Sequence, residues 1–332
     1  MCFRQQTNLG MYFYQSQSHN PYFNIATEAY FLKNFDHDFF FLYINEPSII
    51  VGKHQNTLAE INVHYAMKNQ LKVVRRLSGG GTVFHDMGNI NYCFIQKGAQ
   101  GSLVDFKKYT QPILTTLQDL GVNAYLRGKS DLVIDDLKFS GNAEHVYRNK
   151  VLHHGTLLYN AALSQLNEAI NSDWSKFFDK AVRSNRSHVT NIAAHLNESM
   201  SIDAFISKIK ETVFKLNPDV KSFYLSELDE LSIKQLVKEK FATWEWNFAY
   251  SPAYEFRKSF NFNTNAISVA FKVTKGVIHQ SSIVVNQVQE PIIEQMMNGL
   301  IHDYNTMKVK LQELFEQQKF PFPFDLLLQN SF

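Results

Sequence analysis

The chain has 332 residues, of which 45% are hydrophobic and 19% are charged. This composition is typical of a folded protein and excludes a disordered one. The length exceeds what one typical core needs, so we expect a large domain and a smaller one. The formal net charge is only +2, so we expect no nucleic-acid or membrane partner, and any anion site must be local.

We expect neither a secretory signal nor a membrane-spanning segment. No apolar run approaches the ~18 residues needed to cross a bilayer, and the first ten residues lack the continuous apolar segment of a secretory signal. The two cysteines, Cys2 and Cys93, are far apart and have no metal-ligand spacing. Free thiols are typical of a reducing compartment, so we expect a cytoplasmic protein.

Short strands dominate the first hundred residues. The runs MYFYQ, FFFLYI, SIIVG, LKVVRR and NINYCFI are rich in β-branched and aromatic residues and predict strands. Between them, SHNPYFNIATEAYFLKN predicts a helix that starts at Asn24, and NVHYAMKNQ predicts a short helix.

The middle of the chain predicts one surface helix, a series of strands and a long loop. Apolar residues from Asp105 to Leu120 follow helical spacing, and Gly121 is a typical helix stop. Short strands then alternate with turns as far as Tyr159. The polar stretch from about residue 171 to 189 predicts a loop, and loops of that length are usually functional or mobile. SIDAFISKIKETVFKL and ELDELSIKQLVKEKF predict helices.

The pattern changes after TWEWNFAYSP. Three strands, in FRKSFNF, AISVAFKV and GVIHQSSIVV, precede two helical runs. We therefore expect a large domain in residues 1–250 and a small accessory C-terminal domain in residues 251–332. The fold class is α+β, with mixed and antiparallel sheets flanked by helices, because regular βαβ alternation is missing.

The most informative stretch is RRLSGGGTVFHD, which spans residues 75–86. Adjacent glycines allow positive φ and close approach of the backbone to a ligand, and successive N–H groups in such a turn bind anions. The two preceding arginines add fixed positive charge for phosphate or carboxylate. The alternative is a tight turn with solvent-facing arginines. The stretch has neither P-loop nor dinucleotide-fingerprint spacing.

Two further segments carry candidate chemistry. Lys138, in DDLKFSGNA, is predicted on a strand beside a Ser-Gly-Asn turn, where its ammonium can neutralise charge on a phosphate or carboxylate; a solvated strand lysine is the alternative. In VLHHGTLL, alternation along a strand predicts that one of His153 and His154 faces the site and the other faces away. We expect no zinc site here, because the sequence places no cysteine or carboxylate next to these histidines.

In this order and spacing, the segments resemble the lipoate–protein ligase A family of the biotin/lipoate ligase superfamily. The resemblance begins in SHNPYFNIATEAY, continues through INEPSIIVGKHQN, RRLSGGGTVFHDMGN, LKFSGNAEHVYRNKVLHHGTLLYN and SNRSHVTNI, and ends in TWEWNFAYSPAY and KGVIHQSSI. Biotin–protein ligases share the fold class, but this sequence does not match their Gly-Arg-Gly-rich loop.

The resemblance implies a two-step activity that uses ATP, Mg²⁺ and lipoate. Lipoate and ATP would form lipoyl-AMP, and a lysine of a carrier domain would then take the lipoyl group. The implied carriers are dehydrogenase E2 subunits and the glycine-cleavage H protein.

The resemblance also implies roles for individual residues. Lys138 would be catalytic, between the acyl carboxylate and the α-phosphate, and Asp131 would face Mg²⁺. The implied ATP or adenylate contacts are Arg76, Gly79, Gly80, Gly81, Thr82, Val83, Phe84 and Lys138. The implied lipoate contacts are Arg75, Ser78, His85, Lys138, Asn142 and His154.

Two other functions fit parts of the sequence. A cysteine-dependent octanoyl or lipoyl transferase needs a reactive thiolate near the lysine, but Cys93 lies inside the predicted strand NYCFI and Cys2 at the terminus. A catalytically silent lipoate-binding module needs neither the lysine nor both arginines.

Residues 183–191 resemble the family's adenylate-capping segment. We predict that this segment becomes ordered when the adenylate forms, because it would then gain contacts that the empty site lacks. Limited proteolysis should therefore cut it more slowly when lipoate and ATP are both present. Equal cleavage with and without the two substrates would contradict the prediction.

Overall fold

A computed structural model describes residues 10–98, 103–170, 173–185 and 187–332. Cys2 and Arg186 lie outside these residues. The large part of the chain is built on an eight-stranded sheet with strand order β12-β1-β2-β6-β10-β9-β8-β7. Its strands are β1 (Met11–Gln15), β2 (Asp38–Ile44), β6 (Asn89–Lys97), β7 (Ala124–Arg127), β8 (Asp131–Ile134), β9 (Leu137–Tyr147), β10 (Lys150–Leu158) and β12 (Lys221–Ser222).

This sheet is mixed, as the α+β fold class predicts. β1 runs parallel to β2 and β12, and the other neighbouring pairs run antiparallel. Alternate side chains along β2 point to opposite faces: Phe39 and Phe41 pack in one apolar cluster, and Phe40 and Leu42 in another. Helices cover both faces, so the strands are buried on both sides.

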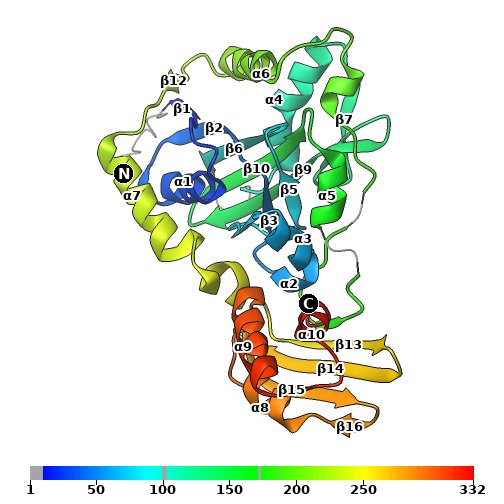
Figure 1. The fold of residues 1–332 in the computed structure, drawn as a ribbon. Coiled ribbons are helices and arrows are strands. Elements are labelled where there is room, and N and C mark those ends of the chain that lie inside the picture. The colour runs from blue at the N-terminus through cyan, green and yellow to red at the C-terminus, as the bar shows by residue number, and fades with distance from the viewer. Residues whose placement is uncertain (1–9, 99–102, 171–172, 186) are drawn as a thin grey trace.

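Two pairs of helices form those covers (Figure 1). The cluster with Phe39 contains residues of α1 and α7, and the cluster with Phe40 contains residues of α4 and α6. Two short π-helical segments, η2 and η3, follow α7 and lead to the C-terminal part. The bounds are α1 (Pro21–Asn34), α4 (Phe106–Asp119), α6 (Ile202–Leu216), α7 (Glu227–Leu236), η2 (Val237–Phe241) and η3 (Glu245–Ala249), with the 3₁₀ turn η1 at Ile192–His195.

A three-stranded sheet of order β4-β3-β5 holds the glycine-rich turn. β3 pairs in parallel with β4 and antiparallel with β5, and the turn connects β4 to β5. Three short helices lie around this sheet (Figure 1). The bounds are β3 (Ser48–Val51), β4 (Lys72–Arg75), β5 (Val83–His85), α2 (Thr57–Glu60), α3 (Val63–Lys68) and α5 (Leu163–Ala169).

The C-terminal part forms a five-stranded antiparallel sheet of order β11-β13-β14-β15-β16 at one end of the molecule (Figure 1). One face packs on helices, since Val269, Phe271 and Val273 of β14 share a cluster with Met307 and Leu311 of α9. The bounds are β11 (Phe177–Asp179), β13 (Tyr254–Phe262), β14 (Asn265–Thr274), β15 (Val277–Val285), β16 (Val288–Gln289), α8 (Pro291–Met297), α9 (Tyr304–Gln317) and α10 (Phe324–Gln329).

The division at residues 250 and 251 stays a prediction. β11 comes from the preceding part of the chain yet pairs with β13, through Phe177 opposite Phe256. The same apolar cluster contains Ile49 and Val51 of β3 together with Phe256 and Phe271. The C-terminal sheet is therefore packed against the sheet that holds the glycine-rich turn.

Several details of the predicted elements are wrong. The first helix begins at Pro21, not Asn24, because the Asn20 side chain caps it by accepting from the backbone N–H groups of Tyr22 and Phe23. The predicted Ser-Gly-Asn turn after Phe139 is continuous strand within β9. The predicted long loop contains β11, and three helices rather than two follow the C-terminal strands. Among the described residues, no helix is long and apolar enough to span a bilayer.

Candidate functional site

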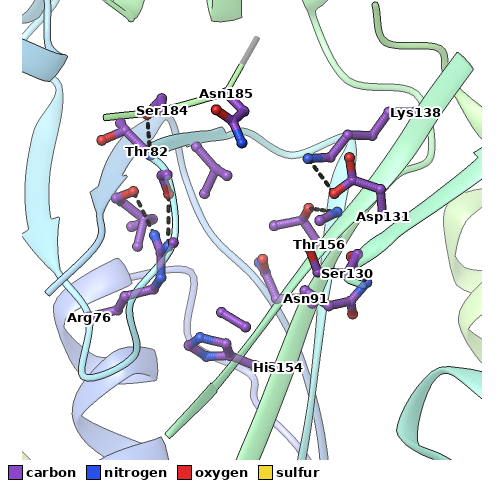
Figure 2. Close-up of a pocket in the computed structure, with 18 of the residues that line it drawn as sticks. Arg76, Thr82, Asn91, Ser130, Asp131, Lys138, His154, Thr156, Ser184 and Asn185 are labelled. Atoms are coloured by element: carbon purple, nitrogen blue, oxygen red, sulfur yellow. Dashed lines mark hydrogen bonds and ion pairs between the residues drawn. The ribbon is translucent and has the colours of Figure 1, made fainter. Parts of the chain in front are cut away.

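A cavity of about 550 Å³ lies between the glycine-rich turn and strands β8 to β10 (Figure 2). β5 and the turn form one wall, and β8, β9 and β10 form the opposite wall. The predicted site residues that line it are Arg76, Gly80, Gly81, Thr82, Val83, His85, Asp131, Lys138, Asn142 and His154. Segments far apart in the sequence thus meet at one cavity.

Lys138 forms an ion pair on the wall opposite the glycine-rich turn (Figure 2). Its Nζ lies 2.9 Å from Oδ1 of Asp131, and each side chain is about a quarter exposed. Gly141 leaves room for this arrangement, because a Cβ there would lie only 3.2 Å from the Lys138 Nζ. The ammonium is therefore held within the cavity instead of extending into bulk solvent.

Arg76 braces the glycine-rich turn from within. Its guanidinium donates to the carbonyl oxygens of Gly79 at 2.6 Å and Gly81 at 2.7 Å, and to that of Ile50 at 3.2 Å. Gly80 has φ +85°, a conformation that L side chains rarely adopt. The buried guanidinium thus places fixed positive charge directly behind a turn that can approach a ligand closely.

A serine from a distant segment closes one side of the cavity beside the turn. Ser184 Oγ accepts a hydrogen bond from the Thr82 N–H at 2.8 Å and from the Gln55 side chain at 3.1 Å, and it donates to the Glu60 carboxylate. Val189 pairs with Lys138 in a parallel bridge. The segment that resembles an adenylate cap therefore contacts both walls, although its predicted ordering remains a prediction.

Four predicted site residues do not line the cavity: Arg75, Ser78, Gly79 and Phe84. The Phe84 side chain is packed in the apolar cluster shared with the C-terminal sheet, so only its backbone is available at the edge strand β5. Ser78 Oγ lies 2.6 Å from His154 Nε2 and accepts from Arg76 Nε at 3.0 Å. Ser78 therefore positions two lining side chains.

Arg75 is fully buried and holds together three parts of the chain. Its guanidinium donates to the carbonyl oxygens of Gly52, Gln55 and Trp246 at 2.8–3.0 Å. It also donates to the hydroxyl of Ser251 at 3.0 Å. Burial lowers the Arg75 pKa to about 10, so the group stays charged at neutral pH while neutral acceptors surround it. Arg75 thus fastens the segment that leads into the C-terminal sheet.

The closed end of the cavity holds a buried polar network. His154 Nδ1 lies 2.9 Å from the Glu28 carboxylate, which also accepts from the Tyr43 hydroxyl at 2.9 Å. Glu28 is 2% exposed, and sequence reasoning missed it. A lone glutamate among the alanines of ATEA was the available signal. His153 faces away and stacks on Tyr109, as strand alternation predicts.

Other lining residues were also missed. They come from α1, from strands β2, β3, β6, β9 and β10, from the turn between β7 and β8, and from the segment that follows β11, whose residues from 183 onward were predicted as a cap but not as cavity lining. Gly128 adopts φ +60° in that turn, and a glycine between two predicted strands was the available sequence signal. The further lining residues are Ile25, Tyr43, Ile50, Asn91, Arg127, Gly128, Lys129, Ser130, Gly141, Ala143, Gly155, Thr156, Val182, Arg183, Ser184 and Asn185.

Few side chains of the cavity could bind the predicted Mg²⁺. The described residues contain no group of three or more His, Cys, Asp or Glu side chains that could hold a metal ion. Asp131 is a cavity carboxylate, and its Oδ1 already pairs with Lys138. Mg²⁺ is usually bound by one or two carboxylates plus substrate phosphates. Asp131 therefore fits an ion that arrives with a nucleotide, and it does not make a site by itself.

Cys93 does not fit a nucleophile's role. It is fully buried in the middle of β6. Burial, together with the nearby Glu28 carboxylate, raises the pKa of its thiol well above the usual value. A thiol that resists ionisation is a poor nucleophile.

Comparison with known proteins agrees with this geometry. Residues 20–214 match the family model described as the lipoyl protein ligase A/B catalytic domain. The chain is 37% identical over 301 residues to lipoate–protein ligase 1 of Staphylococcus aureus, covering 89% of this chain and 91% of that protein. It is 38% identical to lipoate-protein ligase LplJ of Bacillus subtilis, covering 82% and 84% of the two chains. The chain belongs to the lipoate–protein ligase family.

Solved structures share the fold. LipL1 of P. falciparum in complex with lipoate superposes with a TM-score of 0.64 at 21% identity, covering 92% of this chain and 94% of that one. A lipoate-protein ligase A bound with ATP gives a TM-score of 0.59 at 20% identity, covering 72% and 97%. The α+β fold class is confirmed.

We predict that Arg75→Met lowers the free energy of unfolding by roughly 3 kcal/mol, because several buried acceptors lose their donor together. Arg257→Met is the matched control, since Arg257 is an exposed arginine paired with Glu255 and its loss should leave stability unchanged. Urea titration measures both. Equal stability of the Arg75→Met variant and the unmodified protein would show that this network does not fasten the fold.

Proposed function

We propose that this chain is an ATP-dependent, AMP-forming lipoate–protein ligase. It forms lipoyl-AMP from lipoate and ATP and then transfers the lipoyl group to a lysine of a carrier domain. The observation that carries the proposal is the Lys138 ammonium, held by Asp131 across the cavity from the glycine-rich turn. Family membership supports the same activity.

The first half-reaction joins a carboxylate to the α-phosphorus of ATP. A carboxylate oxygen forms the new P–O bond, and the bond to pyrophosphate breaks. Negative charge gathers on the phosphoryl oxygens in the transition state, where a compact ammonium stabilises it most. Lys138 supplies that ammonium, and Gly80 and Gly81 let the backbone lie against the nucleotide.

The second half-reaction uses the same charge. The amine of the carrier lysine attacks the acyl carbon, the bond to AMP breaks, and the amine loses a proton. Lys138 stabilises both the acyl oxygen and the departing phosphate. Fixed alignment of the two reactants can contribute about 7–11 kcal/mol, which suits a cavity whose walls are strands.

Two parts of the cavity suit the two halves of lipoyl-AMP: the outer edge of β5 suits the adenylate, and the buried end suits the lipoyl chain. β5 is an edge strand of its sheet, so the backbone of Val83 can bond an adenine there. Ile25 and Ile50, each 1% exposed, lie at the enclosed part of the lining and suit an aliphatic acyl chain. We therefore place the adenylate at the turn and the lipoyl tail inside.

The finer assignments are proposals of the same kind. Asp131 would hold Mg²⁺ together with the phosphates of ATP, and the ion would offset phosphate charge. The acceptors would be lipoyl carrier domains of dehydrogenase E2 subunits or the glycine-cleavage H protein. A Thermoplasma acidophilum structure that pairs a lipoate protein ligase with its E2 lipoyl domain supports the first. The buried free thiol of Cys93 is compatible with a cytoplasmic location.

We predict that Lys138→Ala abolishes lipoylation of an E2 lipoyl domain while the fold remains intact. The ammonium acts in both half-reactions, so we expect a loss of at least about 100-fold. Mass spectrometry of the carrier measures it. Lys72→Ala is the matched control, because Lys72 is also a strand lysine paired with a carboxylate, that of Glu46, but it does not line the cavity. Full activity of Lys138→Ala would refute the site.

A cysteine-dependent transferase would behave differently. We predict that Cys93→Ser keeps most of the lipoylation activity, because the thiol is buried in β6 and held neutral. The same carrier assay, run with ATP and lipoate, measures this. A complete loss of activity in a folded Cys93→Ser variant would favour the thioester route.

A further inference from the structure

His85 has a buried ring nitrogen without a hydrogen-bond partner. Its side chain lines the cavity and is 2% exposed. Its Nδ1 lies 2.9 Å from Nδ2 of Asn45, but its Nε2 has no hydrogen-bond partner among the described residues. Buried polar groups are nearly always hydrogen-bonded, so an unpaired one in the lining of a cavity needs a partner, which a water molecule or a ligand can supply.

The hydrogen bonds behind His85 determine which ring nitrogen carries the proton. Asn24 Nδ2 donates to the backbone carbonyl oxygen of Ser18 and to Asn45 Oδ1, both at 2.8 Å, and the carbonyl, which can only accept, fixes the orientation of the Asn24 amide. Asn45 must therefore present its NH₂ group to His85, so Nδ1 of His85 is an acceptor and Nε2 carries the hydrogen.

The ring also stays neutral. Burial, with further contributions from Arg76 and His154, lowers the His85 pKa to about 3. At neutral pH the cavity therefore contains one fixed, uncharged N–H donor with no protein acceptor among the described residues.

This donor belongs to the enclosed end of the cavity. Its neighbours in the lining include Tyr43 and His154, which are 4% and 7% exposed, whereas the Lys138 and Asp131 side chains are about a quarter exposed. If the carboxylate of the substrate reacts at Lys138, the far end of its acyl chain contacts the buried end of the cavity. The donor is therefore positioned for the tail of the substrate.

We propose that His85 is a specificity-determining residue whose Nε2–H donates to a dithiolane sulfur of lipoate and thereby disfavours an unsubstituted chain such as octanoate. The inference rests on the proposed function and extends it to the choice of acyl chain. Divalent sulfur is a weak acceptor, whereas the end of an alkyl chain accepts nothing. A site that contains a buried donor rejects the analogue that leaves the donor unpaired.

An internal competition tests the proposal. The protein, ATP and an E2 lipoyl domain are incubated with equal concentrations of lipoate and octanoate, and mass spectrometry counts the two acylated products. Their ratio reports the ratio of the two kcat/KM values. Because a neutral hydrogen bond is modest in water, we expect His85→Phe to reduce the lipoyl-to-octanoyl ratio by about tenfold or less.

Two further variants test whether the change comes from the lost N–H donor. His85→Gln keeps an N–H donor and should restore part of the preference. His64→Phe is the control, because His64 lies on α3, packs against Tyr304 and does not line the cavity, and it should leave the ratio unchanged. Thermal unfolding checks each variant, and His85→Leu replaces His85→Phe if the latter does not fold.

The possible results distinguish a failure of the role proposed for His85 from a failure of the proposed ligase function. A lower lipoate kcat/KM with an unchanged octanoate value supports a donor at the tail. Equal falls for both substrates would overturn the inference, since they would place His85 at the shared carboxyl end or in a purely structural role. An unchanged ratio would overturn it as well. If the unmodified protein makes neither product, the proposed function itself fails.

Discussion

An ammonium held 2.9 Å from a carboxylate, on a wall that faces a glycine-rich turn, is the interaction on which the site depends. Asp131 and Lys138 lie on adjacent strands, β8 and β9, so the sheet itself fixes their separation. A cation paired on one side still has its other N–H groups available for phosphate or carboxylate. Gly141 preserves that position, since a side chain there would crowd the ammonium.

The surrounding residues keep the opposite wall in place. Arg76 donates hydrogen bonds to the carbonyl oxygens of the turn. Arg75 lies at the end of β4 and donates to a residue that precedes the C-terminal sheet. Both arginines are buried. The pair of arginines therefore shapes the glycine-rich turn and attaches it to the rest of the fold. In the proposed function, direct contact with the nucleotide is left mainly to the backbone of the turn.

Local sequence patterns predict much of the fold but only part of the candidate site. Alternating apolar residues identified most strands, and strand alternation separated His154 from His153. Lys138 and the glycines stood out because their motifs are rare. Glu28 and Asn45 did not, since their roles depend on partners more than a hundred residues away or on another strand. Arg75 and Arg76 look alike in sequence, and only tertiary packing turns one toward the cavity and the other into the interior.

The predicted start of the first helix and the predicted turn within β9 were wrong for different reasons. Asn20 caps α1 just before Pro21, a stronger signal than the apolar periodicity that favoured Asn24. Ser140 and Asn142 are typical turn residues, yet pairing with both β8 and β10 keeps that segment extended. Tertiary pairing overrides local propensity where a strand is central in its sheet.

Exchange of labelled pyrophosphate into ATP, measured without any carrier domain, reports directly whether the protein forms an acyl adenylate. We expect exchange that requires lipoate, because acyl adenylate formation is reversible and precedes transfer. Absence of exchange, or exchange that proceeds equally without lipoate, would contradict it and leave a transferase or a silent binding module.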